Sequence, residues 1–509
     1  MIGSVMEAQG VRRWLALGAL AVAMLTIGLD VTVLTVALPT LAVDLHADTS
    51  ALQWFSSAYT LALAAFMLPA GALGDRYGRK KFLLGALLVF GLAAVACAFS
   101  TSSGELIAAR VVLGAAAATM IPLSMAVIPA LFPHERDRQR ALNIWITSTA
   151  IGLPLGPIVG GWLLQHFWWG SAFLLNVPLV VVGATAVALL VPESRSANTF
   201  RVDLPGAVLS AAGMFGVTYG FIRCGQDGWG TVTAWIAIVA GVLVLGAFLL
   251  WQRRTSHPLI DIRLFTAPGF RWGTVYLVLV NFAMFGMLFT LPQYFQAVLG
   301  ADALGSGLRL LPLIGGLALG SRVVDKLEPK LGLRVVLTSG FALLAVGVGM
   351  GALITAHTGY GFAALALVLL GIGMGFVMPA AMNLAMGDLT AERAGSGSAL
   401  LQALRQAAGT IGVAVLGTVL ATQYRSSLGE LNRPPVSDGV NAGVGVAHRL
   451  GDPAVLAHVQ SAFTDGMDAM LWVCAGICVV AMVMAALLTR RKTPAANAEL
   501  DAGQSVHVG

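Results

Sequence analysis

The sequence predicts an all-α integral membrane protein in which fourteen helices cross the bilayer. Of its 509 residues, 58% are hydrophobic and only 11% are charged, and the mean hydropathy is +0.84. A soluble domain carries about 25% charged residues, and a membrane-spanning helix needs about 20 mostly apolar residues. Apolar runs of this length follow one another along the chain, mostly with short connections between them. This pattern leaves no stretch long enough for a second, soluble domain.

The fourteen expected helices group into two bundles of six and one extra pair. An N-terminal bundle is expected within residues 1–191 and a C-terminal bundle within 271–492, with linkers and the extra pair at 192–270. A long extracellular loop is expected at 423–466 and a disordered cytoplasmic tail at 493–509. The helices are expected at residues 14–38, 53–73, 82–100, 105–130, 140–163, 172–191, 204–222, 231–251, 272–294, 304–323, 333–355, 360–384, 397–422 and 467–489.

The basic residues predict the orientation of the chain, because Lys and Arg are enriched in the cytoplasmic loops of membrane proteins. If the N-terminus is cytoplasmic, most of the 30 Lys and Arg fall in cytoplasmic segments. Those in extracellular segments are Arg223, Arg425, Arg433 and Arg449. If the helix count changed by one, the basic residues would no longer be concentrated in the cytoplasmic segments. We therefore expect fourteen spans with both termini in the cytoplasm.

A charged turn joins the second and third expected helices. Its sequence, GALGDRYGRKKFLL, runs from Gly71 to Leu84 and holds one acid, Asp75, among four basic residues. A weaker copy, SRVVDKLEPKLGLRVVL, starts at Ser321 and joins the tenth and eleventh helices, with Asp325 in the place of Asp75. The repeat indicates two similar halves, which is typical of transporters whose halves rock around a central site.

Two ionisable side chains are expected inside the bilayer at similar depths. Asp30 is placed about 12 Å below the outer end of the first helix, and Arg110 about 8 Å below the outer end of the fourth. An ionisable residue inside a span is costly, so it indicates a functional site. The two side chains could interact directly or through water, and Asp30 is the candidate for loading and releasing a proton. The alternatives are a structural hydrogen bond for Asp30 and a structural backbone contact for Arg110.

Several strings resemble those of one family of transporters. GALGDRYGRKK resembles the signature between the second and third helices of the Major Facilitator Superfamily. Further strings narrow the resemblance to the fourteen-helix drug:proton antiporter family: LDVTVLTVALP (29–39), LIAARVVLGAAAA (106–118), GLPLGPIVGG (152–161) and FLLNVP (173–178). They lie in order, and the likeness spans essentially the whole chain. One departure is Trp169-Gly170-Ser171, where many members have Trp-Arg-Trp.

The resemblance implies the Major Facilitator fold and a proton-coupled antiporter of the multidrug efflux type. Such a protein would export lipophilic, often cationic drugs or antibiotics across the bacterial cytoplasmic membrane by alternating access and confer resistance. The alternative is a dedicated exporter of one metabolite or self-made antibiotic. The proton motive force would drive export, because the sequence has no GxxxxGK[ST] string for ATP. Neither an enzyme nor a sensor is favoured, since no HExxH or GxSxG string and no signalling domain is found.

The expected partners are small-molecule substrates, protons and lipid, with no cofactor and no nucleic acid, and the protein is expected to be a monomer. No metal site is expected either: the four cysteines lack a metal-binding spacing and are interpreted as apolar packing residues. They are Cys97, Cys224, Cys474 and Cys478.

The resemblance assigns roles to three further groups of residues. The helix-5 motif is expected to form the contact between the two halves, and it comprises Gly152, Pro154, Gly156, Pro157, Gly160 and Gly161. A cytoplasmic gate is expected in which Asp75 pairs with an Arg and with a helix N-terminus near the eleventh span in the outward-open state. The residues of this gate are Gly71, Asp75, Arg76, Gly78, Arg79 and Asp325. For the basic ones, simple topology anchoring is the alternative.

The remaining candidates are polar or aromatic residues that could line a substrate cavity. Aromatic walls suit flat lipophilic compounds and cations. Packing between helices or a place in the interfacial belt is the alternative for each. The candidates are Trp54, Phe55, Tyr59, Trp145, Asn281, Phe285, Gln293, Gln402, Arg405 and Gln406, of which Arg405 is a second buried cation.

Overall fold

The computed structural model describes residues 2–132, 134–194, 203–256, 258–355, 358–387, 389 and 391–488. Every regular element in this part of the chain is a helix. The α-helices are α1 (Ile2–Asp44), α2 (Thr49–Tyr77), α3 (Arg79–Ala98), α4 (Ser103–Leu131), α5 (Glu135–His166), α6 (Ser171–Leu174), α7 (Asn176–Leu190), α8 (Leu204–Asp227), α9 (Val232–Arg254), α10 (Pro268–Gln293), α11 (Ala303–Leu308), α12 (Leu311–Leu331), α13 (Leu333–Gly351), α14 (Tyr360–Gly387), α15 (Ala391–Leu428), α16 (Val440–Leu450) and α17 (Pro453–Leu488). Short 3-10 or π turns are η1 (Ile262–Thr266), η2 (Tyr294–Val298), η3 (Gly429–Leu431) and η4 (Val436–Asp438).

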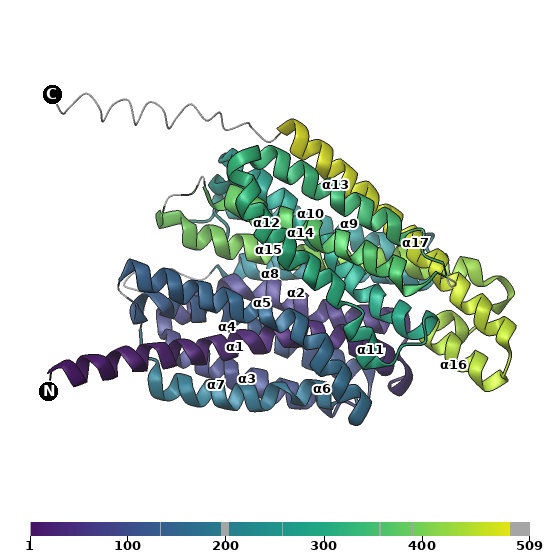
Figure 1. Cartoon of the computed structure of the whole chain (residues 1–509), viewed down its shortest axis with the longest axis horizontal. Coiled ribbons are helices and arrows are strands. Elements are labelled where there is room, and N and C mark those ends of the chain that lie inside the picture. The colour runs from purple at the N-terminus through teal and green to yellow at the C-terminus, as the bar shows by residue number, and fades with distance from the viewer. Residues whose placement is uncertain are drawn as a thin grey trace.

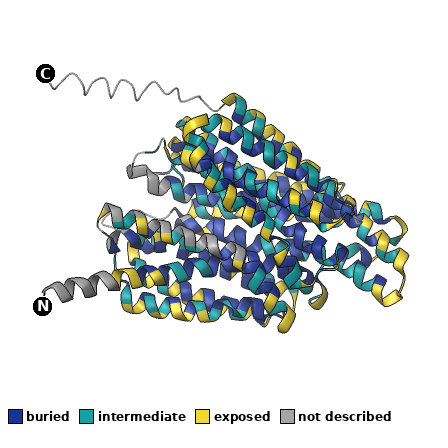
Figure 2. Ribbon diagram, viewed as in Figure 1, coloured by how far each residue is buried: buried dark blue, intermediate teal, exposed yellow. Residues whose placement is uncertain are grey.

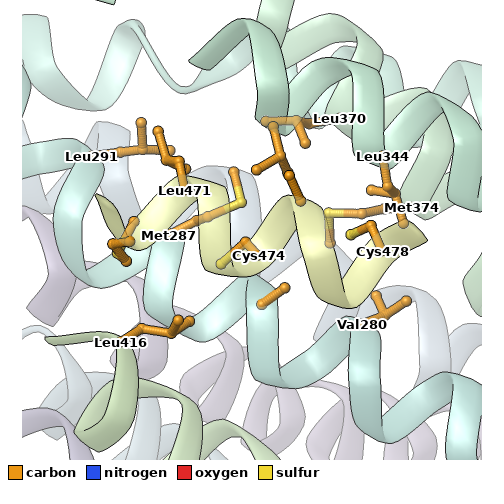
Figure 3. Close-up of a cluster of buried hydrophobic side chains, with 14 of the residues drawn as sticks. Val280, Met287, Leu291, Leu344, Leu370, Met374, Leu416, Leu471, Cys474 and Cys478 are labelled. Carbon is orange, nitrogen blue, oxygen red and sulfur yellow. The ribbon is translucent and has the colours of Figure 1, made fainter. Parts of the chain in front are cut away.

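The helices form two groups, which Figure 1 shows one above the other. In the N-terminal group, α1 packs on α5 and α7, while α4 packs on α2 and α3. In the C-terminal group, α14 packs on α12 and α13, and α15 packs on α10 and α17. Each group has its own apolar core. Figure 3 shows part of the C-terminal core, where Cys474 and Cys478 lie among Met287, Leu370 and Leu471. The four cysteines are free and buried, as expected of packing residues.

The extra pair, α8 and α9, packs at the junction between the two groups. The two helices approach closely, because a Cβ atom on Gly216 would come within 3.0 Å of Gly241. α8 also contacts α2 of the N-terminal group and α15 of the C-terminal group. Met214 of α8 shares a small apolar cluster with Leu61 of α2 and Ala407 of α15. The pair is therefore attached to both halves at once.

The two halves meet at the end of the bundle opposite the chain termini. Hydrogen bonds join them there, from Gln296 to the Val36 carbonyl at 3.1 Å and from Gln165 to Asp302 at 3.0 Å. Toward the end where α1 begins and α17 ends, the helices of the two halves diverge (Figure 1). With the predicted orientation, this is an arrangement closed at the outer side.

Twelve helices in the described residues are long and apolar enough to cross a membrane. They correspond to all of the expected spans except the second and the fifth. Helices are present at both of these places, as α2 and α5, and each contains side chains outside the described set. Large apolar residues such as Leu92, Val232 and Leu243 are exposed, as lipid-facing residues are. Figure 2 shows exposed residues along the surface of both groups of helices. The protein is thus a multi-pass membrane protein, and the count of fourteen spans stays a prediction.

The segment 423–466 differs from the loop that the sequence led us to expect. α15 continues to Leu428, α16 covers Val440–Leu450, and α17 begins at Pro453, so most of the segment is helical. The last long helix therefore begins well before the span expected at 467–489. α16 is amphipathic and packs on α17, with Val440 and Ala447 buried. This packing stabilises the helix.

Candidate proton-coupling site

Asp30 of α1 and Arg110 of α4 form a buried ion pair. Nη1 of Arg110 donates a hydrogen bond to Oδ2 of Asp30 at 2.7 Å, and each residue is no more than 3% exposed. Nε of Arg110 donates to the backbone carbonyl of Phe55 in α2 at 3.0 Å. Burying either charge without its partner would cost several kcal/mol of desolvation free energy, and the ion pair offsets this cost. The two residues that the sequence placed at similar depths are in direct contact.

Two further side chains complete the surroundings of this pair. Nδ2 of Asn176, at the start of α7, donates to Oδ1 of Asp30 at 3.0 Å. The guanidinium carbon of Arg110 lies 4.4 Å from the ring centre of Tyr59, a cation–π contact. Asp30 thus accepts one bond from a cation and one from a neutral amide. Both carboxylate oxygens are satisfied while the carboxyl is ionised, and both bonds change when it takes up a proton.

The amide of Asn176 can serve either protonation state of Asp30. Its Oδ1 atom is buried and has no hydrogen-bond partner. An amide that turns by half a rotation exchanges donor for acceptor. The NH₂ group therefore suits the carboxylate, and the carbonyl oxygen suits the protonated acid.

The helix-5 motif contacts two different neighbours. A Cβ atom on Gly152 would come within 2.9 Å of Gly28, and one on Gly160 within 3.0 Å of Val33, both in α1 of the same half. Gly156 lies against Thr32 of α1 in the same way. The expectation that these three glycines join the two halves is therefore wrong. They share one helical face, and that face is turned toward α1, which carries Asp30.

An adjacent face of α5 contacts the opposite half. A Cβ atom on Gly161 would come within 2.7 Å of the Ala303 carbonyl and of Leu304 in α11. Pro157 lies against Gly307 of α11. The side chain of Pro154 lies outside the described residues. α5 therefore connects α1, which carries Asp30, with the opposite half.

The charged turn after α2 is attached to the N-terminal half. Gly78 has φ +125°, a conformation that favours glycine, and separates α2 from α3. Arg79 donates to the Ala126 carbonyl at 3.0 Å, and Lys80 donates through Nζ to the Ala188 carbonyl at 2.7 Å. These bonds anchor the basic residues at the ends of α4 and α7.

Of the other gate residues, Gly71 faces Pro122 of α4 and Arg76 is exposed, with its guanidinium 5.2 Å from the Tyr77 ring centre. The side chains of Asp75 and Asp325 lie outside the described residues, so the gate role assigned to them stays a prediction.

Four of the expected cavity residues are buried between helices, and their place in a substrate cavity stays a prediction: Phe55, Tyr59, Asn281 and Gln293. Asn281 and Gln293 donate to carbonyls one turn back in their own helix, Leu277 and Phe289. Trp54 packs on Phe215 of α8, with ring centres 5.6 Å apart. Side chains that are apolar, or that are hydrogen-bonded within their own helix, pack well between helices. The spacing of residues along the sequence does not distinguish a position in a helix interface from one in a cavity wall.

The other cavity candidates are half-buried. Trp145 donates through Nε1 to Ser124 at 3.0 Å. Phe285 of α10 and Gln402, Arg405 and Gln406 of α15 are partly exposed.

Comparison with known proteins identifies the family. The model of the Major Facilitator Superfamily matches residues 20–413, most of the chain. The chain belongs to the Major Facilitator Superfamily.

Relatives of this Major Facilitator protein are named for resistance and export. The tetracenomycin C resistance and export protein of Streptomyces glaucescens is 31% identical over 500 residues, covering 95% of this chain and 93% of the relative. The methyl viologen resistance protein SmvA of Salmonella typhimurium is 33% identical over 424 residues, covering 82% and 84%. The multidrug efflux pump LfrA of Mycolicibacterium smegmatis is 32% identical over 423 residues, covering 82% of each chain.

Solved structures show the same fold. The crystal structure of a bacterial homolog of the human lysosomal transporter Spinster, in an inward-facing and occupied conformation, matches with a TM-score of 0.66. The match covers 94% of this Major Facilitator protein and 98% of that chain, at 17% identity. At this identity the likeness establishes the fold alone.

Sequence reasoning missed one residue of the site. Asn176 is the polar member of FLLNVP, a string that we used only for its resemblance to the family. The available signal was an amide two residues before a proline inside an apolar run. Nothing in the spacing along the chain indicated that it would face Asp30, which lies 146 residues earlier.

Proposed function

We propose that this Major Facilitator protein is a proton-coupled antiporter that exports lipophilic drugs or antibiotics from the cytoplasm and so confers resistance. The observation that carries the coupling is the buried group of Asp30, Arg110 and Asn176. The names of the relatives, which include resistance, export and efflux proteins, support the direction and the class of substrate.

The coupling follows from the charge balance of the ion pair. While Asp30 is ionised, it neutralises Arg110 and holds α1 against α4. A proton on Asp30 removes that negative charge and leaves the guanidinium with the Phe55 carbonyl and the Tyr59 ring. An uncompensated buried cation costs several kcal/mol, so the protonated protein favours an arrangement in which Arg110 finds water or another partner.

α5 transmits this change to the opposite half. Its glycine face packs directly on α1, and Gly161 packs on α11. Close packing without side chains between two helices leaves little room for one to move without the other. A shift of α1 relative to α4 therefore loosens or tightens the outer contact between the halves.

The proton gradient supplies enough free energy for efflux. A membrane potential of 100 mV is worth about 2.3 kcal/mol per charge, and one pH unit about 1.4 kcal/mol per proton. One proton can therefore support a gradient of a neutral compound of about a few hundred-fold. On this proposal the transporter is a monomer in the bacterial cytoplasmic membrane, with both termini in the cytoplasm and no need of ATP or a cofactor.

Everted membrane vesicles test the coupling. A respiration-driven proton gradient is established, and its dissipation is followed after the addition of ethidium, tetraphenylphosphonium or an antibiotic panel. The parent protein should respond, and Asp30→Asn should not at equal expression. Asp44→Asn changes an exposed acid on the same helix and should behave as the parent. Normal coupling in Asp30→Asn would rule out Asp30 as the proton carrier.

A dedicated exporter of one compound is the second candidate. Its support is that some relatives are named for a single compound, such as the cephamycin export protein CmcT of Amycolatopsis lactamdurans, 35% identical over 439 residues. The same panel separates the two candidates. Responses to several unrelated compounds support multidrug efflux, and a response to one compound class supports the dedicated exporter.

A further inference from the structure

Arg405 is a cation without an acidic partner in the middle of α15. Its Nη1 atom donates to Oε1 of Gln402 at 3.2 Å, and its Nε atom is buried without any hydrogen-bond partner. Among the described residues, ion pairs join Arg110 with Asp30 and Arg223 with Asp227, and none includes Arg405. A guanidinium whose Nε atom is buried without a partner, and which is hydrogen-bonded to a neutral amide, is costly, so it indicates a place where an anion binds.

The residues around Arg405 lie on one face of α15. Gln402, Arg405, Gln406 and Gly409 are spaced by three or four residues and therefore share a face. Two of them are amide side chains, which can donate to an oxyanion as the guanidinium does. All three polar side chains are partly exposed, which leaves them accessible to a ligand.

An aromatic ring lies next to this face. A Cβ atom on Gly409 would come within 2.9 Å of the Phe285 ring, so the missing side chain allows α10 to bring Phe285 against α15. Phe285 is itself partly exposed. The ring provides an apolar surface for a flat ligand one turn from the guanidinium.

Toward the outer end of α15, the face that carries Arg405 reaches the contact between the two halves. Val413, one turn beyond Gly409, is buried in a cluster with Leu34 of α1 and Phe55 of α2. Thr410 donates to Thr60 of α2 at 2.7 Å. Arg405 therefore lies just on the cytoplasmic side of the point where the halves close, about 12 Å from the expected cytoplasmic end of its helix.

We infer that Arg405, Gln402, Gln406 and Phe285 form a subsite for an aromatic compound that carries a carboxylate. Guanidinium and carboxylate match in shape and can form two parallel hydrogen bonds, while the ring of the ligand packs on Phe285. Compounds bound at this subsite would therefore be anionic, whereas the family resemblance implied substrates that are often cationic. The inference rests on the proposed efflux function and specifies one class of its substrates.

Matched pyrene compounds test the subsite. The purified full-length transporter is placed in phosphatidylcholine nanodiscs, which contain no anionic headgroup that could occupy the site. Binding of 1-pyrenebutyrate and of its neutral analogue 1-pyrenebutanol is measured by quenching of tryptophan fluorescence, with empty nanodiscs correcting for partition into lipid. The parent should bind the acid at least about ten-fold more tightly than the alcohol, because hydrogen bonds to a charged group are worth about 1.5–3 kcal/mol.

Three variants identify the residue responsible. Arg405→Gln should raise the Kd of pyrenebutyrate about ten-fold or more and change that of pyrenebutanol less than two-fold. Arg405→Lys should lie between it and the parent, because the charge is kept and the planar fork is lost. Arg223→Gln removes a partly exposed arginine of α8 and should change neither Kd. An equal loss for acid and alcohol in Arg405→Gln would mean a structural role only, and equal affinities in the parent would overturn the subsite.

Ethidium efflux from cells separates this inference from the proposed function. If ethidium is exported but pyrenebutyrate has no preference for the parent, the efflux function stands and the anion subsite is wrong. If no compound is exported while the selective binding of pyrenebutyrate is observed, the subsite stands and the efflux proposal is wrong.

Discussion

Arg110 donates to Asp30 at 2.7 Å between α1 and α4, and neither residue reaches the surface of the bundle. The pair is held from three sides, by the Phe55 carbonyl, the Tyr59 ring and the Asn176 amide. Such a group is expensive to bury and changes its net charge with a single proton. These two properties together are the reason for proposing that the group couples protons to helix packing.

Removing Arg110 should abolish coupled efflux. In Arg110→Ala the carboxylate of Asp30 loses its counter-ion, and breaking a buried pair by removing one partner costs about 3–5 kcal/mol. The variant should reach the membrane but give little drug resistance in cells. Arg140→Ala, which alters an exposed arginine of α5, should remain fully resistant. Full resistance of Arg110→Ala at equal expression would argue against a coupling role.

Removing the amide of Asn176 should weaken drug-coupled proton flux. In Asn176→Leu the ionised carboxyl of Asp30 loses a hydrogen-bond donor, and a hydrogen bond to a charged group is worth about 1.5–3 kcal/mol. The rate of drug-induced proton flux in everted vesicles should therefore fall about ten-fold or more at equal expression.

Asn281→Leu is the matched control for that experiment, because Asn281 is equally buried but donates only to Leu277 in its own helix. Its proton flux should equal that of the parent. An unchanged flux in Asn176→Leu would show that the amide does not contribute to coupling.

A methyl group on Gly156 should destabilise the N-terminal half. The new Cβ atom would meet Thr32 of α1, and overpacking of this kind costs about 1–3 kcal/mol. The melting temperature of purified Gly156→Ala in detergent should fall. Gly85→Ala places the same methyl group in open space within α3 and should leave the melting temperature unchanged or slightly raised. Equal melting temperatures for the two variants would contradict close packing of α5 on α1.

A larger side chain at Gly161 should open the outer contact between the halves. A Cβ atom there already meets α11 at 2.7 Å, so the additional atoms of Val have no space. In the parent, a cross-link should form through a short bis-maleimide reagent between cysteines that replace Gln165 and Asp302, whose side chains are hydrogen-bonded at 3.0 Å. Gly161→Val should reduce its yield, whereas Gly246→Val, in open space on α9, should not. The same yield in both would mean that Gly161 does not control the closure.

Much of the architecture could be predicted because bilayer length and apolar composition determine where a helix can cross. The helices lie where the apolar runs do, and the depth of Asp30 and Arg110 followed from counting residues along two helices. The structure of segment 423–466 was harder to predict, because a short amphipathic helix such as α16 is stabilised by its packing on α17 and does not stand out by its hydropathy.

The sequence by itself determined which residues are costly to bury and which share a helical face, since both depend only on chemistry and the helical repeat. It identified Asp30, Arg110 and the glycines of α5 on these grounds. Only the tertiary structure decided what each face meets: α1 against Gly152, Gly156 and Gly160, Asn176 against Asp30, and Gln402 in place of an acid, among the described side chains, against Arg405. The reason is physical. Helical periodicity sets the direction of a side chain around its own axis, but the neighbour in that direction depends on how all the helices pack together.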